Sequence, residues 1–486
     1  MKKVLFFILL GVLSLTSVVL YNTFTFESLQ MDTDALPPAE ELSVPTEAIH
    51  HLAEAIPFQT ISHYDTSTID YSTFEGFHQY LESTYPLLHQ HLKKEIVNGY
   101  SLLYTWKGSD QTLAPLLLAA HMDVVPVEEA TLSNWKQGPW SGNIHDDYLW
   151  GRGSIDDKNA IIAIMEAVEL QLSKGITPKR TIYLAFGHDE ETRGSGAMAM
   201  AELLKQRGVR VGMAVDEGGM VSKGIVPGIE ESQVALIGSA EKGAVTLKLS
   251  TKMEAGHSSM PSKENSIEVI SQAILKLQET PMEDQLSLPV KGFLRYLGPE
   301  MPFVLKMAMA NQWLFEPIIL DNYRQSNTGR ASIRTTHTPT IFNSGIKENV
   351  IPSTAEATIN FRILPGETVK DVVNHATKVI DDKRVSISTV GSGKNPSNVS
   401  PDQGEEFNSL RKTIHQIYPT TISTPFLLIA ATDGRYYETI CDHVYRFSPT
   451  HYTGEDLDRL HGINERIALS DFEESIRFYY QLMVNY

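Results

Sequence analysis

Three short segments of the chain place histidines or paired carboxylates directly after an apolar, strand-like run. In the first, His121 and Asp123 follow the run Leu-Leu-Leu-Ala-Ala at 116–120. Side chains alternate along a strand, so these two residues share a face, where a carboxylate can orient an imidazole that binds a metal ion. The second segment is Gly-His-Asp-Glu-Glu at 187–191, and the third is Asp-Glu-Gly-Gly at 216–219. Imidazole and carboxylate groups are typical ligands of catalytic zinc.

The three segments can form one site, because ligands in α/β sheets bind outside the carboxyl ends of the strands. Between the first two lies the glycine loop 151–157, ahead of a helical run at 160–172. A carboxylate in that loop either caps the helix or reaches into the crevice. We expect Asp156 and Asp157 to divide these roles, so that one caps the helix and the other bridges metal ions.

Five motifs in order resemble the aminoacylase and carboxypeptidase family of co-catalytic zinc peptidases. The similarity runs from about residue 50 to the end and includes His461-Gly-Ile-Asn-Glu465. Within the family, the branch of carboxypeptidase S and the N-fatty-acyl-amino-acid hydrolase/synthases is most similar. The five motifs are His-Met-Asp at 121–123, Gly-His-Asp-Glu-Glu at 187–191, Val-Asp-Glu-Gly-Gly at 215–219, Gly-His-Ser-Ser at 256–259 and Asn-Val-Ile-Pro at 349–352.

The resemblance implies two zinc ions per chain, or other divalent ions in their place. One ion is expected on His121 and Asp216, the other on Glu191 and His461, with Asp156 bridging both. A second C-terminal histidine, His451, competes with His461. We favour His461, because the family places its ligand before a short glycine-containing step and then Asn-Glu.

Glu190 is then the free carboxylate of the site. Beside a ligand but not one itself, it can take a proton from the bridging water and pass it to the leaving amine. Asp123 is expected to orient His121. An adjacent pair of glutamates is otherwise common in solvated loops, so this role depends on the surrounding motifs.

Four further residues resemble substrate-handling groups of the family. His257 resembles the lid histidine that stabilises the tetrahedral oxyanion, although a turn histidine would look the same. Arg362 and Asn349 resemble lid residues that hold the substrate carboxylate, which suits the planar fork of arginine. Arg435 is a weaker candidate for the same task. An arginine paired with a neighbouring acid would be indistinguishable at this stage.

Apolar runs that alternate with helical periodicity predict an α/β fold, and 486 residues with 42 % hydrophobic content suffice for two cores. The resemblance implies a catalytic domain with a central mixed sheet flanked by helices, and an inserted, smaller α+β lid domain. We place the catalytic domain at 50–243 and 393–486 and the lid at 244–392. An apolar stripe at 293–320 is expected to be a buried helix, or else to line an acyl groove or face a bilayer.

The N-terminus predicts a membrane segment. Lys2 and Lys3 precede an uncharged run of eighteen residues, near the lower limit for a spanning helix. No Ala-x-Ala cleavage site follows it, so an uncleaved signal anchor at 1–21 is favoured over a cleaved signal peptide. Residues 22–49 would be the tether, and the catalytic body would lie outside the cytoplasm, anchored or, alternatively, secreted.

Composition narrows the partners. The net charge of −18 argues against nucleic acid, and the single cysteine excludes an intrachain disulfide and thiolate zinc sites. The resemblance to the family implies a zinc amidohydrolase acting on N-acyl amino acids, with N-fatty-acyl amino acids favoured. A carboxypeptidase or dipeptidase acting on short hydrophobic peptides is the close alternative. A binding ectodomain without turnover is the alternative from another class. The oligomeric state stays open.

Overall fold

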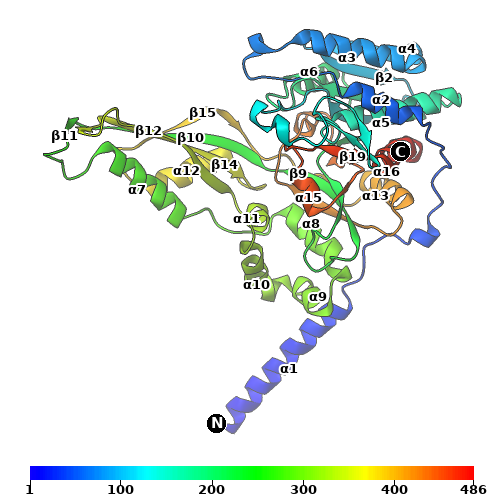
Figure 1. Ribbon diagram of the computed structural model, residues 1–486. Helices are drawn as coiled ribbons and strands as arrows, with labels where there is room; N and C mark the ends of the chain where they lie inside the picture. Colours follow the sequence, from blue (N-terminus) through cyan, green and yellow to red (C-terminus); the bar gives the residue numbers. More distant parts are fainter.

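A ten-stranded mixed sheet forms the centre of the larger part of the molecule, and the computed structural model describes all 486 residues (Figure 1). The order of nine strands is β1-β2-β6-β3-β7-β17-β9-β8-β18, and β16 pairs with β9. The strands are β1 (Lys93–Val97), β2 (Ser101–Trp106), β3 (Leu116–His121), β6 (Ile182–Gly187), β7 (Met213–Asp216), β8 (Met220–Lys223), β9 (Gln233–Glu241), β16 (Ile422–Leu428), β17 (Val444–Arg446) and β18 (His451–Tyr452). The predicted α/β class is confirmed.

The three strands that carry the sequence motifs lie side by side at the middle of this sheet. β3 pairs in parallel with both β6 and β7, so the carboxyl ends of all three meet at one edge. Every residue of β3 and β7 is buried, which explains why their sequences are continuous apolar runs. The expected strand positions therefore agree with the structure, and their chemistry-bearing ends converge.

Helices cover both faces of the sheet. One face packs against α2, α3, α5 and α16 in the largest apolar core, and the other packs against α6 and α14. The helices of this part are α2 (Glu47–Ala55), α3 (Tyr71–Thr84), α4 (Pro86–His91), α5 (Lys158–Ser173), α6 (Ser195–Gln206), α13 (Glu405–Ile417), α14 (Gly434–Tyr437), α15 (Gly454–Leu457) and α16 (Leu469–Asn485). A small three-stranded sheet of β4 (Ile144–His145), β5 (Tyr148–Trp150) and β19 (Arg466–Ala468) joins the glycine loop to the C-terminal segment.

A four-stranded antiparallel sheet forms an arm that extends from the body (Figure 1). Its order is β12-β14-β10-β15, and apolar side chains on one face pack against α7 and α12. Capping boxes begin both helices, at Asn265 and Thr368. The arm contains β10 (Gly243–Lys252), β11 (Gly256–His257), α7 (Ser266–Glu279), β12 (Thr336–Ser344), β13 (Val350–Ile351), β14 (Thr354–Ile363), α12 (Val369–Ile380) and β15 (Ser386–Lys394).

The region between α7 and β12 leaves the arm and returns to the body. It forms α8 (Leu288–Leu297), α9 (Phe303–Ala310), α10 (Gln312–Arg324) and α11 (Asn327–Ile333). Val290 and Leu294 of α8 pack with Leu427 of β16. The expected lid at 244–392 is therefore interrupted by a segment that belongs to the body. The apolar stripe at 293–320 is three helices, partly buried and partly exposed, rather than one buried helix.

The segment after the first helix, α1 (Lys2–Phe24), runs along the body rather than hanging free from it. The side chain of Gln30 donates to Ser423 O (3.1 Å) and accepts from Ser423 N (2.9 Å). Further on, Gln416 binds Pro37 O (2.8 Å) and Glu40 N donates to Gln481 (2.8 Å). The middle of the expected tether at 22–49 is therefore a strap bound to the body, and the last residues of the tether belong to α2.

A buried histidine under this strap should make the fold less stable in acid. His415 is 3 % exposed, and burial together with Arg411 lowers its pKa to about 4. The unfolded chain takes up this proton near pH 6.5 and the folded chain does not, so the stabilisation is complete above pH 6.5 and is lost as the pH falls toward 4. The unfolding free energy should decrease between pH 6.5 and 4.5, and we expect His415→Asn to make this decrease smaller by about 2 to 3 kcal/mol. Chemical denaturation at several pH values measures this, and parallel curves for the variant and the parent would contradict it.

Candidate metal centre

The carboxylate of Asp156 lies between two histidines. Its Oδ1 is 2.9 Å from His121 Nε2, and its Oδ2 is 3.1 Å from His461 Nε2. His121 ends β3, whereas His461 lies in the loop before β19, 340 positions later in the chain. The structure therefore brings together three of the predicted ligands from distant parts of the sequence, with the carboxylate in the bridging place.

Each histidine has a second carboxylate of its own. Glu217 Oε1 is 3.3 Å from His121 Nε2, and Glu191 Oε1 is 3.2 Å from His461 Nε2. Donor atoms about 2.0 to 2.2 Å from a tetrahedral zinc ion are themselves about 3.3 to 3.6 Å apart, which these distances approach. Oε1 of Glu191 is buried and receives no hydrogen bond of good geometry, although the His461 imidazole lies 3.2 Å away. The residues present thus suit two divalent cations, with Asp156 between the two histidines and a glutamate beside each histidine.

Asp216, a predicted ligand, forms no ion pair with either histidine, whereas the neighbouring Glu217 is 3.3 Å from His121 Nε2. Asp216 is the last residue of β7, and adjacent side chains at a strand end point in different directions. The buried Oδ2 of Asp216 has no partner and lies next to Gly434, on the side of the loop that follows β16. Both residues are carboxylates in one motif, so the residue types alone did not separate them.

Asp157 also lies near His121 rather than capping its helix. It occupies the N-cap position of α5, yet its side chain makes no capping hydrogen bond. Oδ2 instead accepts from the backbone N–H of His121 (3.2 Å). The expectation that one of the two aspartates caps the helix is therefore wrong, because Asp157 makes no capping hydrogen bond, while Asp156 is the one that lies between the two histidines. His121, Asp157 and Glu217 form a second possible ligand group around the same histidine.

Arg152 and Glu465 hold the glycine loop and the C-terminal histidine together, and sequence reasoning gave neither a role. The buried carboxylate of Glu465 accepts from Gly153 N (2.9 Å) and Ile155 N (2.9 Å) and contacts the Arg152 guanidinium. Arg152 in turn donates to the carbonyl of His461 (3.1 Å). This pair fixes Asp156 and His461 relative to each other. The sequence did contain a hint of this role, because Arg152 lies in the glycine loop 151–157 and Glu465 ends the motif that begins at His461.

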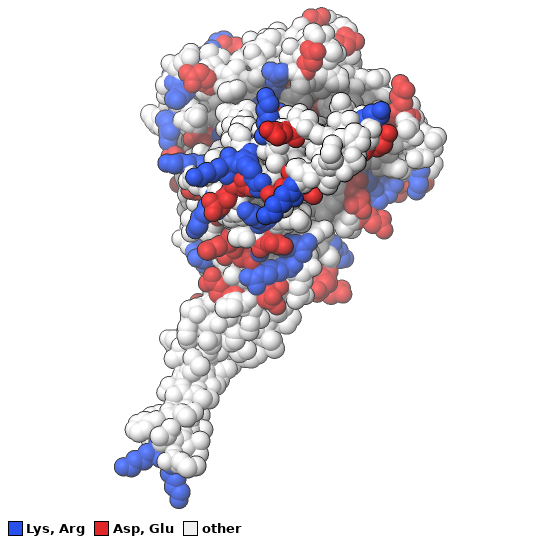
Figure 2. Space-filling view, turned by 90° about the vertical axis from the view of Figure 1, so that its left-hand side faces the viewer, with Lys and Arg blue, Asp and Glu red and all other residues white.

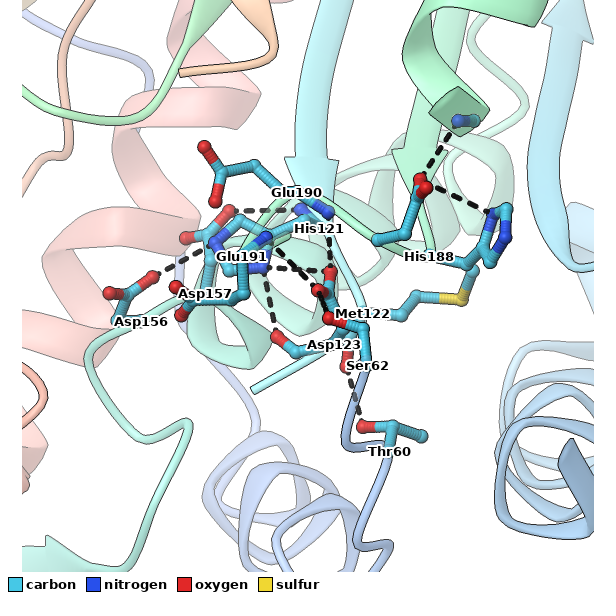
Figure 3. A network of polar contacts seen from close by, with 12 residues as sticks. Thr60, Ser62, His121, Met122, Asp123, Asp156, Asp157, His188, Glu190 and Glu191 are labelled. Carbon is cyan, nitrogen blue, oxygen red and sulfur yellow. Dashed lines mark hydrogen bonds and ion pairs between the residues drawn. The ribbon is translucent and has the colours of Figure 1, made fainter. Parts of the chain in front are cut away.

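Asp123 orients the neighbouring loop as well as His121 (Figure 3). The Nδ1 of His121 meets the backbone carbonyl of Asp123 at 2.9 Å, while the carboxylate is farther away, at 3.4 Å. That carboxylate accepts from the backbone N–H groups of Glu190 (3.0 Å) and Glu191 (3.1 Å) and from the hydroxyl of Ser62 (2.6 Å). The backbone therefore sets the tautomer of the imidazole, and the side chain positions both glutamates.

Replacement of Asp123 by Ala is expected to weaken metal binding by about 10- to 100-fold, as loss of groups that support ligands usually does. Two backbone N–H groups lose their acceptor, so Glu191 is no longer held in place. Competition with a chromophoric chelator measures the affinity. Ser67→Ala, in an exposed turn, is the control. Unchanged affinity in a folded Asp123→Ala protein would contradict this role.

The cluster carries more negative charge than its two histidines neutralise. Burial, followed by the nearby Asp156, raises the pKa of Glu217 to about 8. Burial also raises the pKa of Glu191. The pKa of His461 rises to about 10, chiefly because it bonds Asp156 and Glu191. Buried carboxylates at this density are costly unless cations or protons compensate them. The electrostatics therefore favour divalent cations at this point.

Glu190 stands next to the cluster without being part of it. Its backbone is held by Asp123, and Figure 3 draws no polar contact to its carboxylate, which lies beside His121. Burial raises the pKa of Glu190 well above its ordinary range, with His121 opposing the shift. A carboxylate with a raised pKa that is free of partners can accept a proton and keep it for a later step.

The structure does not bring the predicted substrate residues to this cluster. His257 and Asn349 lie together at the free end of the arm, where β11 pairs with β13 and Ser258 N donates to Asn349 O (3.2 Å). Arg362 is an exposed residue of β14. Arg435 is 3.3 Å from the buried Glu241, which is the ordinary ion pair that its sequence could not exclude. His451 lies apart from the cluster and bonds Asp471 (2.9 Å).

Comparison with known proteins gives a consistent result. Residues 117–485 match the model of peptidase family M20/M25/M40. The chain is 39 % identical to probable carboxypeptidase S-like 2 of Dictyostelium discoideum, over 98 % of this chain and 92 % of that protein. It is 38 % identical to N-fatty-acyl-amino acid synthase/hydrolase PM20D1 of Homo sapiens, over 88 % and 85 %. An M20 family metallo-carboxypeptidase from Sulfolobus solfataricus has a similar fold, with a TM-score of 0.66 and 18 % identity over 90 % and 99 % of the chains.

Proposed function

Because this chain belongs to peptidase family M20/M25/M40, whose members are hydrolases, we propose that it cleaves the amide bond between an acyl group and an amino acid with a free carboxylate. The observation that carries this proposal is the position of Asp156 between two histidine–glutamate pairs, with the unpartnered Glu190 beside them. Such a centre suits addition of water to an amide. A binding ectodomain without turnover has no physical need for this set.

The proposed ligands differ from the expected set at one residue. His121 and Glu217 would hold one divalent cation, His461 and Glu191 would hold the other, and Asp156 would be shared between them. Zinc is the cation we favour for both places, since histidine and carboxylate ligands with an open position are typical of catalytic zinc. When bound, the pair of cations supplies Lewis-acid polarisation of the amide carbonyl and eases deprotonation of water.

Glu190 performs the proton transfers of the proposed reaction. Its carboxylate accepts a proton while the water oxygen bonds to the carbonyl carbon of the substrate. It returns that proton to the nitrogen as the carbon–nitrogen bond breaks, which leaves a carboxylic acid and a free amino acid. Asp123 holds the backbone of Glu190 and so fixes the position of this base.

His257 and Asn349 are proposed to act from the arm. They share one hairpin tip, so movement of the arm toward the body would deliver them together. The imidazole would donate to the oxyanion, and Asn349, whose buried Oδ1 has no partner, would bind the substrate together with Arg362. Arg435 is retained only as a weaker candidate, because Glu241 already pairs with it.

Long-chain N-acyl amino acids are the favoured substrates. The support is similarity to relatives named N-fatty-acyl-amino acid synthase/hydrolase. A zinc carboxypeptidase or dipeptidase acting on short hydrophobic peptides is the second candidate, and similarity to carboxypeptidase S of Saccharomyces cerevisiae, at 33 % identity over 85 % of this chain, favours it. Both reactions use the same centre and differ in the acyl pocket.

A substrate panel tests the proposal. The full chain in detergent is incubated with N-fatty-acyl amino acids, N-acetyl amino acids and dipeptides, and mass spectrometry follows their consumption. We expect the fatty-acyl compounds to be consumed first, with activity lost on chelation and restored by Zn²⁺. Preferential loss of dipeptides would favour the carboxypeptidase. The absence of any metal-dependent turnover would contradict the proposed chemistry.

We also propose that α1 is an uncleaved signal anchor, with the body outside the cytoplasm. α1 is long and apolar enough to cross a membrane. Its last turns contact the body, where the fully buried Asn311 donates to Val19 O (3.1 Å) and to Thr23 Oγ1 (3.4 Å). Cleavage near residue 21 would remove Val19 O from this buried amide, which would keep only Thr23 Oγ1 and Met307 O as acceptors. Carbonate extraction and the intact mass of the membrane-bound protein test this, and a soluble chain lacking α1 would contradict it.

A further inference from the structure

Two helices beside α1 expose an unusual number of large apolar side chains. They belong to α9 and α10, and the exposed set, here called the α9–α10 surface, consists of Phe303 (49 % exposed), Val304 (68 %), Trp313 (60 %), Leu314 (37 %) and Ile318 (63 %). Apolar surface of this kind on a folded protein usually marks a contact site. No segment of this chain covers it.

The α9–α10 surface is continuous with the anchor helix. α9 packs against α1, and the rings of Phe24 and Phe303 are 6.0 Å apart. Asn311, at the junction of α9 and α10, binds Asn22 (2.9 Å) in addition to the α1 backbone. Figure 2 shows uncharged surface extending from α1 onto the adjoining end of the body, with the positive charges of Lys2 and Lys3 at the far tip of α1. The body therefore cannot pivot freely about the anchor without breaking these contacts.

The position of the contacts along α1 sets their depth in a bilayer. Counted from Val4, the first residue after Lys2 and Lys3, a rise of 1.5 Å per residue reaches Val19 after about 22 Å and Phe24 after about 30 Å. The hydrocarbon core of a bilayer is about 30 Å thick. The buried Val19 and Thr23, which face α9 and Asn311, thus lie in the outermost part of that core. Helices packed at this level meet the acyl chains and headgroups rather than water.

The polar residues of the same region suit a bilayer surface. Lys306, on α9, is only partly exposed and has a long apolar stem that allows its charge to reach the headgroups. A hollow of about 360 Å³ beside Phe26 is lined by Lys291, Arg295 and Asp402. Arg295 pairs with Asp402 (2.6 Å), so Lys291 is the residue that can offer a positive charge to lipid phosphates here. Trp313 is of the residue type that favours the interface between membrane and water.

We propose that the α9–α10 surface is inserted in the outer interface of the membrane that α1 crosses, so that the body lies against the bilayer instead of standing away from it. This inference rests on the proposed anchor and is independent of the reaction proposed above. It implies that an amphiphilic substrate dissolved in the membrane is held close to the body. A second copy of the chain, or another protein, is the competing occupant of this surface.

Tryptophan quenching by brominated lipids tests the proposal directly. The chain has five tryptophans; Trp106, Trp135 and Trp150 are buried, Trp140 is intermediate, and only Trp313 is strongly exposed. The full chain is reconstituted in phosphatidylcholine vesicles whose acyl chains carry bromine either near the headgroup or near the chain end. We expect bromine to reduce tryptophan emission, and to reduce it more when it lies near the headgroup than near the chain end. This extra loss should disappear in Trp313→Phe. Trp140→Phe is the matched control and should leave the loss unchanged.

Several results would rule out contact between the α9–α10 surface and lipid. If α1 resists carbonate extraction and Trp313 emission is the same with and without bromine, the surface does not touch lipid and the proposal is wrong. The proposal is equally wrong if α1 is extracted or if Trp313 is shielded by self-association, detected as concentration-dependent crosslinking. Hydrolysis of a water-soluble N-acetyl amino acid by Trp313→Phe should equal that of the parent in detergent, which separates this inference from the proposed reaction.

Discussion

Replacement of Glu190 by Gln is expected to lower the rate of amide hydrolysis by about 100- to 10,000-fold, the usual contribution of a positioned general base. The amide has nearly the shape of the carboxylate but cannot accept the proton from water. Glu190 lies beside the cluster and makes no ligand contact in it, so metal content and unfolding midpoint should stay close to those of the parent. Loss of turnover with full metal loading is the specific signature.

Single-turnover assays with the favoured substrate class, together with metal analysis of the same samples, measure both quantities. Glu128→Gln, at an exposed glutamate outside the metal cluster, is the matched control and should retain parental activity. A Glu190→Gln protein that retains parental activity would show that another group moves the proton. A variant that loses its metal would show that Glu190 is a ligand instead.

Replacement of Glu217 by Gln is expected to weaken the binding of one divalent cation by about 100-fold or more, because loss of supporting groups alone costs about 10- to 100-fold. Glu217 is 3.3 Å from the His121 nitrogen that faces Asp156. Asp216→Asn is the natural comparison, since it removes the same charge one residue earlier. We expect it to change the affinity by less than about 10-fold, through longer-range electrostatics alone.

Isothermal titration of the chelated variants with Zn²⁺ separates the two residues. One cation should bind normally to Glu217→Gln, at the side of His461 and Glu191, while the other is lost or weakened. The reverse order of effects, with Asp216→Asn the more damaging, would restore the ligand set expected from the sequence. Near-UV circular dichroism of both variants controls for misfolding, because both side chains are largely buried.

The sequence predicts much of this centre because the ends of buried strands can be recognised where an apolar run meets polar residues. The apolar runs before His121, Glu190 and Asp216 are buried parallel strands, and the adjacency of β6, β3 and β7 makes their ends converge. Family membership follows from motif order and is confirmed. The sequence could not decide whether Asp216 or Glu217 lies beside His121, because this depends on how the chain turns after β7.

Other features depend on contacts between distant segments. Glu465 joins the loop before α5 to that before β19, and no local pattern announces a partner so far away. The strap beyond α1 is polar and rich in proline, which is typical of a free linker, yet backbone and amide groups such as those of Gln30 bind it to the body. The split of the apolar stripe into α8, α9 and α10 follows from Pro302 and from the buried junction at Asn311.

Anomalous X-ray diffraction at the zinc edge, from crystals grown with Zn²⁺, tests the central claim most directly. We expect two peaks flanking the carboxylate of Asp156, one next to His121 and Glu217 and the other next to His461 and Glu191. A single peak, peaks bound by Asp216 in place of Glu217, or no peak at Asp156 would contradict it.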